Sequence, residues 1–273
     1  MRAQWDAAAT GWNAHAPRIR EWLRQPTDAM CRMAGVAAGM RVLDVAAGAG
    51  DQTLTLTERV GPMGHVLATD LSPVIIGLAR DNALRAGLNQ VECRVADGQA
   101  LGVPESTFDA AVCRLGLMFF PDPLQGLREI HRALRPGARL CTMVFAGPER
   151  NPCITTLMST ALAHARLPAG SPYEPAGLLS LGMPGHLDQL FRDAGFRDVA
   201  TTAIDVPFRL PSVDDYLAFV RSSAGPVMQI LGGLGESDAE AAWRDMRDRL
   251  DTFSTDDGWV GQNELLLTVG CAS

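Results

Sequence analysis

Histidine and paired cysteine are scarce in this sequence of 273 residues. It has five His and six Cys, and no two Cys form a Cys-x-x-Cys pair. Zinc sites and disulfide frameworks both depend on such spacings. We therefore predict no metal site, reduced cysteines that pack as small apolar side chains, and a cytoplasmic protein.

Long apolar runs and basic stripes are missing as well. No uncharged apolar stretch approaches the ~20 residues of a membrane helix, and the first residues lack the apolar core of a signal peptide. Acidic residues outnumber basic ones by 31 to 24, giving a formal net charge of −7, and no basic stripe suits a nucleic-acid backbone. We predict a soluble protein with a small-molecule partner and with neither a nucleic-acid nor a membrane partner. The sequence leaves a homodimer open.

What is present is an alternation of short apolar strands and amphipathic helices between residues 41 and 146. The predicted strands cover 41–45, 65–69, 91–95, 108–114 and 139–145. The predicted helices between them cover 52–60, 73–86 and 123–134. Such an alternation predicts βαβ units, a parallel sheet and an α/β fold.

Beyond residue 146 the pattern is looser. The predicted elements there are helices near 155–165 and 187–194, a strand at 198–208, a mostly helical stretch at 211–251 and a last strand at 262–271. We predict an N-terminal helical cap over 1–35, a core over 36–210 and 260–273, and a helical insertion or lid over 211–259. All five Trp fall in the cap and the insertion, which predicts an apolar pocket between them, with a core that docks these helices onto the sheet as the alternative for about half of the aromatics.

The strand at 41–45 runs into a loop of small residues. Ala46, Gly48 and Gly50 follow Asp44, and a helix begins beyond them. Small side chains let a ligand approach the backbone, and the free N–H groups of a helix start suit an anionic group. A tight βα turn without a ligand explains the same fragment. Positive φ strains an Ala by about 1 kcal/mol or more, so we expect Ala46 in an ordinary backbone region.

Acidic residues also follow the next two strands. Asp70 ends the second strand about 20 residues after the loop, where dinucleotide-binding sheets hold a ribose diol. Ser72 and Pro73 already suit the start of the next helix, so Asp70 is not needed as its cap. The Asp97-Gly98 pair suits an adenine amino group, with an Asx turn as the alternative. Because the carboxyl ends of parallel strands meet at one edge, we predict one ligand site there.

These motifs together resemble the class I S-adenosylmethionine-dependent methyltransferases, and within them the group around the ubiquinone/menaquinone biosynthesis methyltransferases. The resemblance rests on the runs 42–50, 68–72 and 96–98, with support from 108–114, 127–137 and 191–196. It implies a Rossmann-like, doubly wound and mostly parallel seven-stranded sheet with an antiparallel last strand and a helical cap. It also implies S-adenosylmethionine as the cofactor and methyl transfer to a small-molecule acceptor, a natural product or metabolite.

The resemblance assigns the loop after the first strand to the methionine part of the cofactor. Ala46, Gly48 and Gly50 would line that part, although relatives carry Gly where Ala46 stands. Asp44 would support the loop. Arg114, at the end of the fourth strand, would place its backbone carbonyl near the amino group of the cofactor, unless its side chain faces the acceptor instead.

The resemblance assigns the adenosine part of the cofactor to the ends of the second and third strands. By resemblance, Asp70 would hold the ribose hydroxyls, Leu71 would pack on adenine, and Asp97 and Gly98 would contact the adenine amino edge. The sequence has no His after the fourth strand, so a base borrowed from relatives at that place is in doubt. His15 in the N-terminal cap is the remaining candidate base, with a solvated helix surface as the alternative.

Three other functions fit parts of the pattern. An NAD-dependent dehydrogenase needs Gly-x-Gly-x-x-Gly, and counting from Gly48 the third position is Thr53. An aminopropyl transferase would need acidic residues around the fourth strand, where 113–116 has none. A non-catalytic S-adenosylmethionine-binding regulator stays open from the sequence alone.

Overall fold

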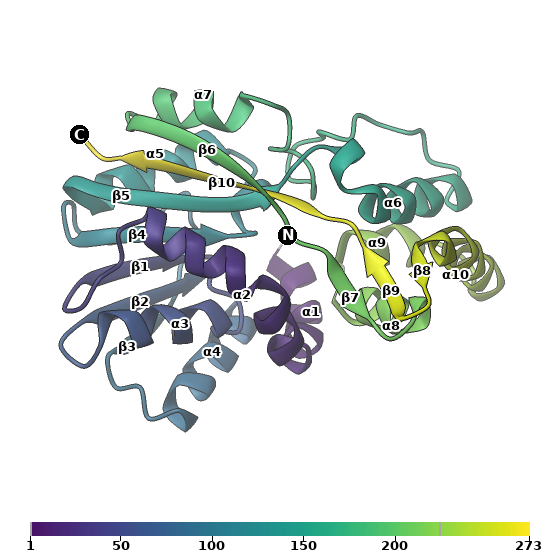
Figure 1. The fold of residues 1–273 in the computed structure, drawn as a ribbon, viewed down its shortest axis with the longest axis horizontal. Coiled ribbons are helices and arrows are strands. Elements are labelled where there is room, and N and C mark those ends of the chain that lie inside the picture. Colours follow the sequence, from purple (N-terminus) through teal and green to yellow (C-terminus); the bar gives the residue numbers. More distant parts are fainter. Residues whose placement is uncertain (1, 224) are drawn as a thin grey trace.

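A seven-stranded sheet forms the larger part of the structure, a computed structural model that describes residues 2–223 and 225–273 (Figure 1). In spatial order its strands are β3 (Val91–Val95), β2 (His65–Asp70), β1 (Arg41–Val45), β4 (Phe108–Arg114), β5 (Leu134–Phe145), β10 (Glu264–Cys271) and β6 (Arg197–Asp205). β10 runs antiparallel to both of its neighbours, and the other ladders are parallel. The predicted Rossmann-like sheet with an antiparallel last strand is confirmed. The strand order reverses beside β1 and β4, where sheets of this kind bind ligands.

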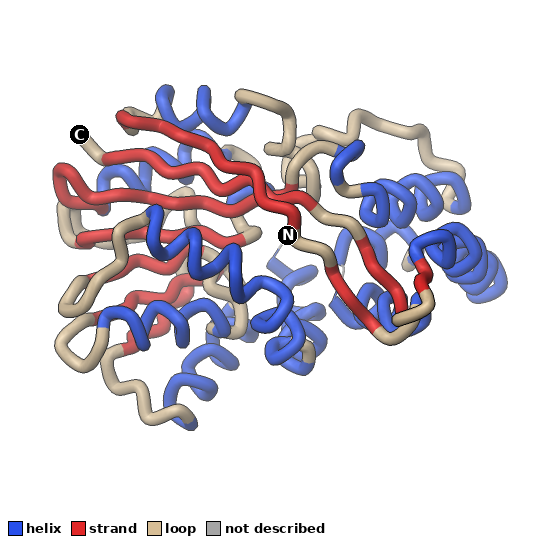
Figure 2. Tube along the Cα trace, viewed as in Figure 1, coloured by secondary structure: helices blue, strands red, loops and turns tan. Residues whose placement is uncertain are grey.

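Helices cover both faces of this sheet (Figure 1 and Figure 2). The pair α2 (Ala16–Met33) and α3 (Asp51–Val60) packs on one face, and the pair α5 (Pro123–Ala133) and α7 (His186–Asp193) on the other. α4 (Pro73–Arg85) packs on β2 and β3. Because both faces are covered, β1 and β4 are buried along almost their whole length and read as continuous apolar runs.

A smaller, mostly helical lobe lies beyond the carboxyl ends of the parallel strands (Figure 2). Its elements are α6 (Pro152–His164), β7 (Phe208–Leu210), α8 (Val213–Ser223), α9 (Gly225–Leu231), α10 (Glu236–Leu250), β8 (Ser254–Thr255) and β9 (Gly258–Gly261). The described residues also form three short 3-10 turns, η1 (Leu117–Phe119), η2 (Pro148–Arg150) and η3 (Asp251–Phe253). The lobe has its own apolar core, in which the rings of Tyr216 and Trp259 stack with their centroids 4.2 Å apart.

Two predicted strands have different bounds in the structure. The strand predicted at 198–208 is divided into β6 and β7, because Pro207 has no N–H to donate to a ladder. The predicted insertion is not wholly helical, since it ends in the β8–β9 hairpin, and β10 begins only at Glu264. The division into three parts stays a prediction, and α6 packs with the helices of the lobe.

α1 (Arg2–Ala14) lies between the sheet and the lobe, in contact with α4 and α8. Gly11 permits the close approach to α8, because a Cβ there would lie 1.8 Å from the backbone oxygen of Ser222. On the other side, Asp6 accepts a hydrogen bond from the Ser72 hydroxyl, and the Asn82 amide donates to Asn13 over 3.0 Å. These contacts hold α1 over the carboxyl edge of the sheet.

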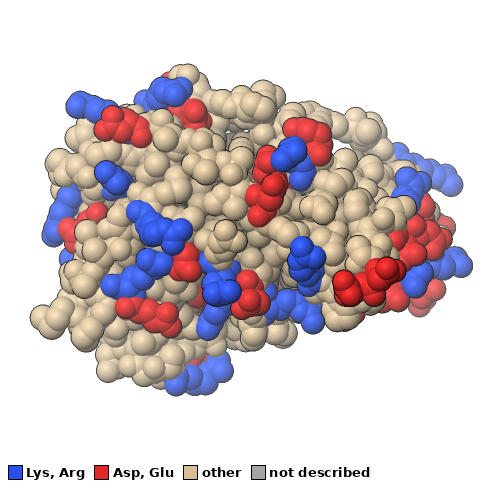
Figure 3. Space-filling model, viewed as in Figure 1, with Lys and Arg blue, Asp and Glu red and all other residues tan. Residues whose placement is uncertain are grey.

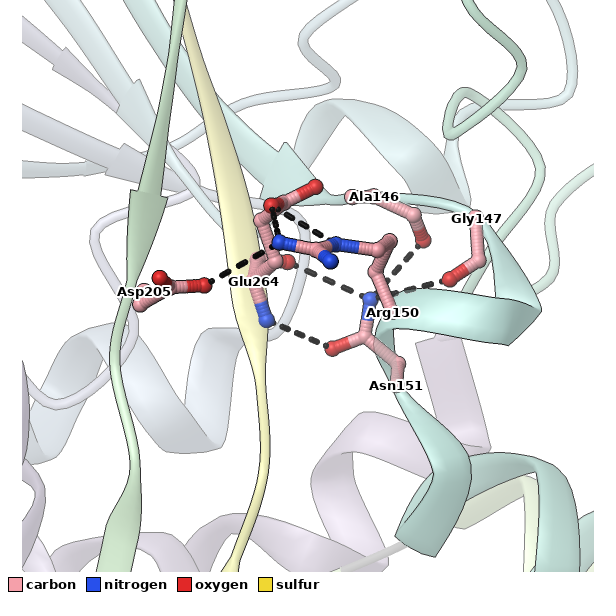
Figure 4. Close-up of polar contacts among 6 residues, drawn as sticks. All are labelled: Ala146, Gly147, Arg150, Asn151, Asp205 and Glu264. Carbon is pink, nitrogen blue, oxygen red and sulfur yellow. Dashed lines mark hydrogen bonds and ion pairs between the residues drawn. The ribbon is translucent and has the colours of Figure 1, made fainter.

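A polar junction joins the end of the sheet to α6 (Figure 4). The fully buried Asn151 amide donates to the carbonyls of Ala146, Gly147 and Glu264 at 3.0–3.2 Å, and its oxygen accepts from the Glu264 N–H at 3.2 Å. Arg150 pairs with the Glu264 carboxylate at 2.6 Å and reaches Asp205 at 3.5 Å. The Asn151 side chain therefore holds the backbone that follows β5 against the start of β10.

The surface carries charges of both signs. On the face shown in Figure 3, basic and acidic side chains are interspersed without a continuous basic stripe. None of the helices in the described residues is long and apolar enough to cross a membrane. Within the same residues, no group of three or more His, Cys, Asp or Glu is arranged to hold a metal ion.

Candidate active site

A cavity of about 300 Å³ lies at the carboxyl ends of β1, β2, β3 and β4. Seven of the predicted site residues line it together: Ala46, Gly48, Asp70, Leu71, Asp97, Gly98 and Arg114. The remaining predicted residues, Asp44, Gly50 and His15, do not line this cavity. The strand ends therefore meet as the sequence predicts, around one hollow that is large enough for a ligand.

The loop after β1 corrects one expectation about its backbone. Ala46 has φ 55°, in the left-handed region, and not the ordinary conformation expected for Ala. The chain has to turn at once, because the next N–H, that of Ala47, donates to the Thr69 carbonyl on β2 over 2.9 Å. Leu115, at the end of the neighbouring β4, is also left-handed at φ 55°. Two strained residues at adjoining strand ends are typical of a functional site.

Asp44 and Gly50 support the loop from behind. Asp44 is fully buried and accepts hydrogen bonds from the side chains of Gln52 and Thr53 in α3. Burial raises the pKa of Asp44 to about 7, although both hydrogen bonds oppose that rise. Gly50 has φ 86° and precedes α3, and a Cβ on it would lie 3.0 Å from the Cβ of Ala79. Both residues fix where α3 begins.

Asp70 shapes the backbone as well as the cavity. Its two carboxylate oxygens accept from the N–H groups of Gly48 and Ser72, each at 3.0 Å. Burial raises the pKa of Asp70, and these hydrogen bonds oppose the rise. Ser72 caps α4 as predicted, since its hydroxyl accepts from the Ile75 N–H at 3.1 Å. Asp70 is not the cap of α4, as expected, but it has a larger structural part than the sequence indicates, because its carboxylate joins the loop to the turn before α4.

The Asp97-Gly98 pair forms the Asx turn that was the alternative, and its contact with adenine stays a prediction. Asp97 Oδ1 accepts from the Gln99 N–H at 2.9 Å, which is the Asx turn, and the residue remains exposed at the cavity rim. Gly98 is needed for packing, because a Cβ there would lie 2.2 Å from the ring of Phe120. The glycine therefore lets Phe120 close over the end of β3.

A buried ion pair forms the wall between β1 and β4. Arg114 donates to Asp51 over 2.5 Å and to the Thr27 hydroxyl over 3.0 Å, and only 6% of the Arg114 side chain and 11% of the Asp51 side chain are exposed. Asp51 lines the cavity, and the sequence reasoning missed it. The signal was present: an acidic residue follows the glycine loop after β1, and Arg114 ends the strand beside it.

A second cavity of about 100 Å³ adjoins the first on the side of the helical lobe. Four residues line both cavities: Trp5, Trp12, Leu115 and Phe119. The rest of its lining is mostly aromatic and aliphatic, and no Asp, Glu, Lys, Arg or His of the described chain contributes. The rings of Trp5 and Phe119 meet edge to face at 5.0 Å, and those of Phe208 and Phe219 at 5.3 Å. The Trp residues of the cap thus line a pocket, as expected, whereas Trp243 and Trp259 of the insertion line neither cavity and belong to the core of the lobe.

His15 lies where α1 meets α2, outside the lining of either cavity. Its Nε2 is 2.8 Å from the Ser222 hydroxyl, and its ring packs on Phe219. Burial, together with the nearby charge of Arg18, lowers the pKa of His15. Its part as a base stays a prediction.

Comparison of the sequence with known families adds to this geometry. The sequence model of the ubiE/COQ5 methyltransferase family matches residues 19–162, more than half of the chain. A demethylmenaquinone methyltransferase from Deinococcus radiodurans is 35% identical over 174 residues, which cover 58% of this chain and 68% of that protein. A ubiquinone/menaquinone biosynthesis C-methyltransferase UbiE from Hahella chejuensis is 36% identical over 137 residues, covering 50% and 53%. The chain thus spans about half to two thirds of the length of these curated relatives.

A solved structure supports the fold along nearly the whole chain. The YcgJ protein from Bacillus subtilis superimposes with a TM-score of 0.62 at 17% identity, covering 91% of this chain and 98% of that one. At this identity the likeness concerns the fold alone, and the helical lobe has to be interpreted from its own residues.

Proposed function

This chain belongs to the ubiE/COQ5 methyltransferase family and is an S-adenosylmethionine-dependent methyltransferase, and on that premise we propose that it methylates an uncharged, apolar small molecule held in the second cavity. The observation that carries the acceptor class is the lining of that cavity, which among the described residues includes no charged side chain. A charged acceptor would lose its hydration there without gaining an ion pair.

The first cavity would hold the cofactor. Asp70 would accept from the ribose hydroxyls, because each of its oxygens keeps a lone pair beyond the one used by a backbone N–H. Leu71 would pack on adenine, with Asp97 and Gly98 at the adenine edge. The small loop residues leave room for the methionine part, and a volume of about 300 Å³ is at the lower end of the range for ligand pockets. The residues present therefore fit the cofactor.

The task left to the protein is orientation and exclusion of water. S-adenosylmethionine, when bound, supplies a methyl group on a positively charged sulfur, so no residue has to activate the leaving group. Trp5, Trp12, Leu115 and Phe119 bound the region between the two cavities with apolar surface. Such a wall keeps water from the reacting atoms and holds the acceptor in one orientation.

The lining of the second cavity also limits how the acceptor can lose a proton. Burial raises the pKa of Tyr216, so its hydroxyl stays neutral, and the carboxyl of Asp44 lies behind the loop. An electron-rich ring carbon suits such a site, because it supplies the electron pair of the new bond itself and releases its proton only after methyl transfer, to bulk water as the acceptor leaves the apolar site. The names of the quinone-biosynthesis relatives make a quinol ring the first acceptor to test.

The test combines binding with turnover. Calorimetry with S-adenosylhomocysteine is expected to give micromolar or tighter binding. Methyl transfer from labelled S-adenosylmethionine is then measured for apolar quinols and for charged amines and acids of similar size. Met158, which lines the second cavity, is changed to Phe to fill it. We expect KM for the acceptor to rise about tenfold or more while S-adenosylhomocysteine binds as before.

The matched control is Met183→Phe, at a residue that lines neither cavity and is 46% exposed. This change should leave both binding and KM unaltered. Turnover confined to charged acceptors, or an unchanged acceptor KM in Met158→Phe, would overturn the assignment of the second cavity. A failure to bind S-adenosylhomocysteine would overturn the assignment of the first.

A further inference from the structure

Trp12 in α1 has a side-chain donor that the rest of the described chain leaves unused. Its indole nitrogen, Nε1, is buried and has no hydrogen-bond partner among the described residues. Trp22, which also lines the second cavity, donates from its Nε1 to the Val206 carbonyl over 3.0 Å. The buried Trp259 donates to the Leu250 carbonyl over 2.8 Å. A buried donor without an acceptor is unfavourable, so the nitrogen of Trp12 requires an explanation.

The unused donor belongs to a residue at the boundary between the two cavities. Trp12 is one of the four residues that line both of them. Of the other three, Leu115 and Phe119 have no polar side-chain atom, and the indole nitrogen of Trp5 is not among the buried atoms that lack a partner. In a mostly apolar pocket, a few polar groups fix the orientation of the ligand. The missing partner of the Trp12 nitrogen is therefore expected to come from a ligand.

We propose that the Trp12 N–H donates a hydrogen bond to an oxygen of the methyl acceptor and so orients the acceptor at the boundary with the cofactor cavity. The inference rests on the proposed function, in which the second cavity holds an uncharged, apolar acceptor. It narrows that class to apolar molecules that carry an oxygen with a free lone pair. Because an indole N–H only donates, carbonyl, ether and hydroxyl oxygens all fit, whereas a group that can only donate does not.

Other side-chain donors in the second cavity are engaged or lie away from the boundary. The Trp22 nitrogen is used by Val206, and the Ser223 hydroxyl donates to the Phe219 carbonyl over 2.5 Å. Asn263 donates to the Gly261 carbonyl over 3.1 Å, and it lines the second cavity without lining the first. An oxygen that lies at the boundary therefore depends on Trp12 for its hydrogen bond.

One alternative partner for the Trp12 nitrogen is the face of an aromatic ring. The rings of Trp12 and Phe219 meet edge to face, with their centroids 6.4 Å apart. That separation is near the outer limit for aromatic pairs, and an N–H over a ring face is a weak hydrogen bond. The contact with Phe219 therefore does not replace an oxygen as the partner.

Two ring compounds of nearly the same shape test the donor directly. Methoxybenzene has an ether oxygen, which can only accept a hydrogen bond, where ethylbenzene has a methylene group. Calorimetry with protein that is saturated with S-adenosylhomocysteine measures the affinity for each compound. We expect the wild type to bind methoxybenzene at least as tightly as ethylbenzene, because the Trp12 N–H compensates the ether oxygen for its lost hydration.

Trp12→Phe removes the donor and keeps an aromatic ring. We expect this change to weaken the binding of methoxybenzene relative to that of ethylbenzene about 5- to 30-fold, since the ether oxygen is then buried without a donor. S-adenosylhomocysteine should bind within about twofold of the wild type. Trp22→Phe is the matched control, because it makes the same change in the same cavity at an indole whose N–H is already used by Val206. The ratio of the two affinities should then stay as in the wild type.

Two results in Trp12→Phe would overturn the inference: an unchanged ratio of the two affinities, or weaker binding of S-adenosylhomocysteine in place of a changed ratio. The second result would assign the N–H to the cofactor. Thermal unfolding checks that each variant is folded. If Trp12→Phe is not, the wild type decides, because a preference for ethylbenzene over methoxybenzene also contradicts the inference. If the wild type binds S-adenosylhomocysteine but neither ring compound, the assignment of the second cavity is itself wrong.

Discussion

The wall of the first cavity combines apolar side chains with backbone turns and hydrogen-bonded polar side chains, whereas the wall of the second is made mainly of aromatic rings and aliphatic side chains, most of them on helices. The polar part of the first wall has fixed positions, because Asp70 in that wall is held by two hydrogen bonds and Asp44, behind the wall, is held by two more. The apolar wall depends on shape and burial, which tolerate substitution better. Cofactor affinity should therefore change when a single hydrogen-bonding atom of the first wall is replaced. The choice of acceptor should change when the volume of side chains in the second wall is altered.

The largest expected effect is a fall in stability with rising pH that arises from the polar half. The folded-state pKa of Asp44 is raised to about 7, so the folded protein holds one proton more than the unfolded chain between about pH 4 and pH 7. Stability is then highest below that window and falls as pH rises through it, by at most about 4 kcal/mol. Asp44→Asn, which cannot titrate, should remove the Asp44 share of this fall and leave that of Asp70, whose pKa is also raised, when urea unfolding is compared at about pH 5 and pH 8.

Tyr216→Phe provides the contrast from the apolar half. Burial raises the pKa of Tyr216 beyond the working range, so its removal should leave the pH dependence as in the wild type. Two results would contradict this assignment: a weaker pH dependence of the free energy of unfolding in Tyr216→Phe, or an unchanged pH dependence in Asp44→Asn. Either would mean that the titrating buried group is not on the cofactor side.

The next effect concerns the junction that couples the two halves. Asn151→Ala removes an amide that bonds four backbone groups of Ala146, Gly147 and Glu264 (Figure 4). We expect a loss of about 3 kcal/mol in the free energy of unfolding, since the Ala146 carbonyl and the Glu264 N–H lose their partner, whereas the carbonyls of Gly147 and Glu264 keep backbone donors. Arg150→Ala, which removes an exposed ion pair beside it, should cost less than about 1 kcal/mol. Equal losses in the two variants would mean that the buried amide does not hold the junction.

The sequence predicts the polar half better than the apolar half. Strand ends, the glycine loop and the acidic residues after β2 and β3 follow local rules, and Asp70 and Asp97 do reach one cavity. The sequence alone does not identify Asp51, because its role depends on Arg114, which lies 63 positions later in the chain. Their contact can be predicted only when β4 is known to be the neighbour of β1.

The features that the sequence does not predict depend on packing in three dimensions. The left-handed Ala46 contradicts its own propensity, since the bond from Ala47 to β2 fixes the turn. The lining of the second cavity joins α1, α6 and α8, segments far apart in the sequence, and periodicity shows each apolar face without showing which faces meet.

The smallest effect tests the backbone strain that both walls share. Ala46 and Leu115 each have φ 55°, at the ends of neighbouring strands. Ala46→Gly relieves that strain at the loss of one methyl group, so it should raise the free energy of unfolding by about 0.5–1 kcal/mol in urea titrations. Leu115→Gly relieves the same strain but removes a large side chain from the apolar wall, so its net effect should be destabilising. The two variants should change the free energy of unfolding in opposite directions, because the polar wall depends on backbone shape and the apolar wall depends on side-chain volume. A destabilised Ala46→Gly would mean that the packing of the Ala46 methyl group outweighs the strain.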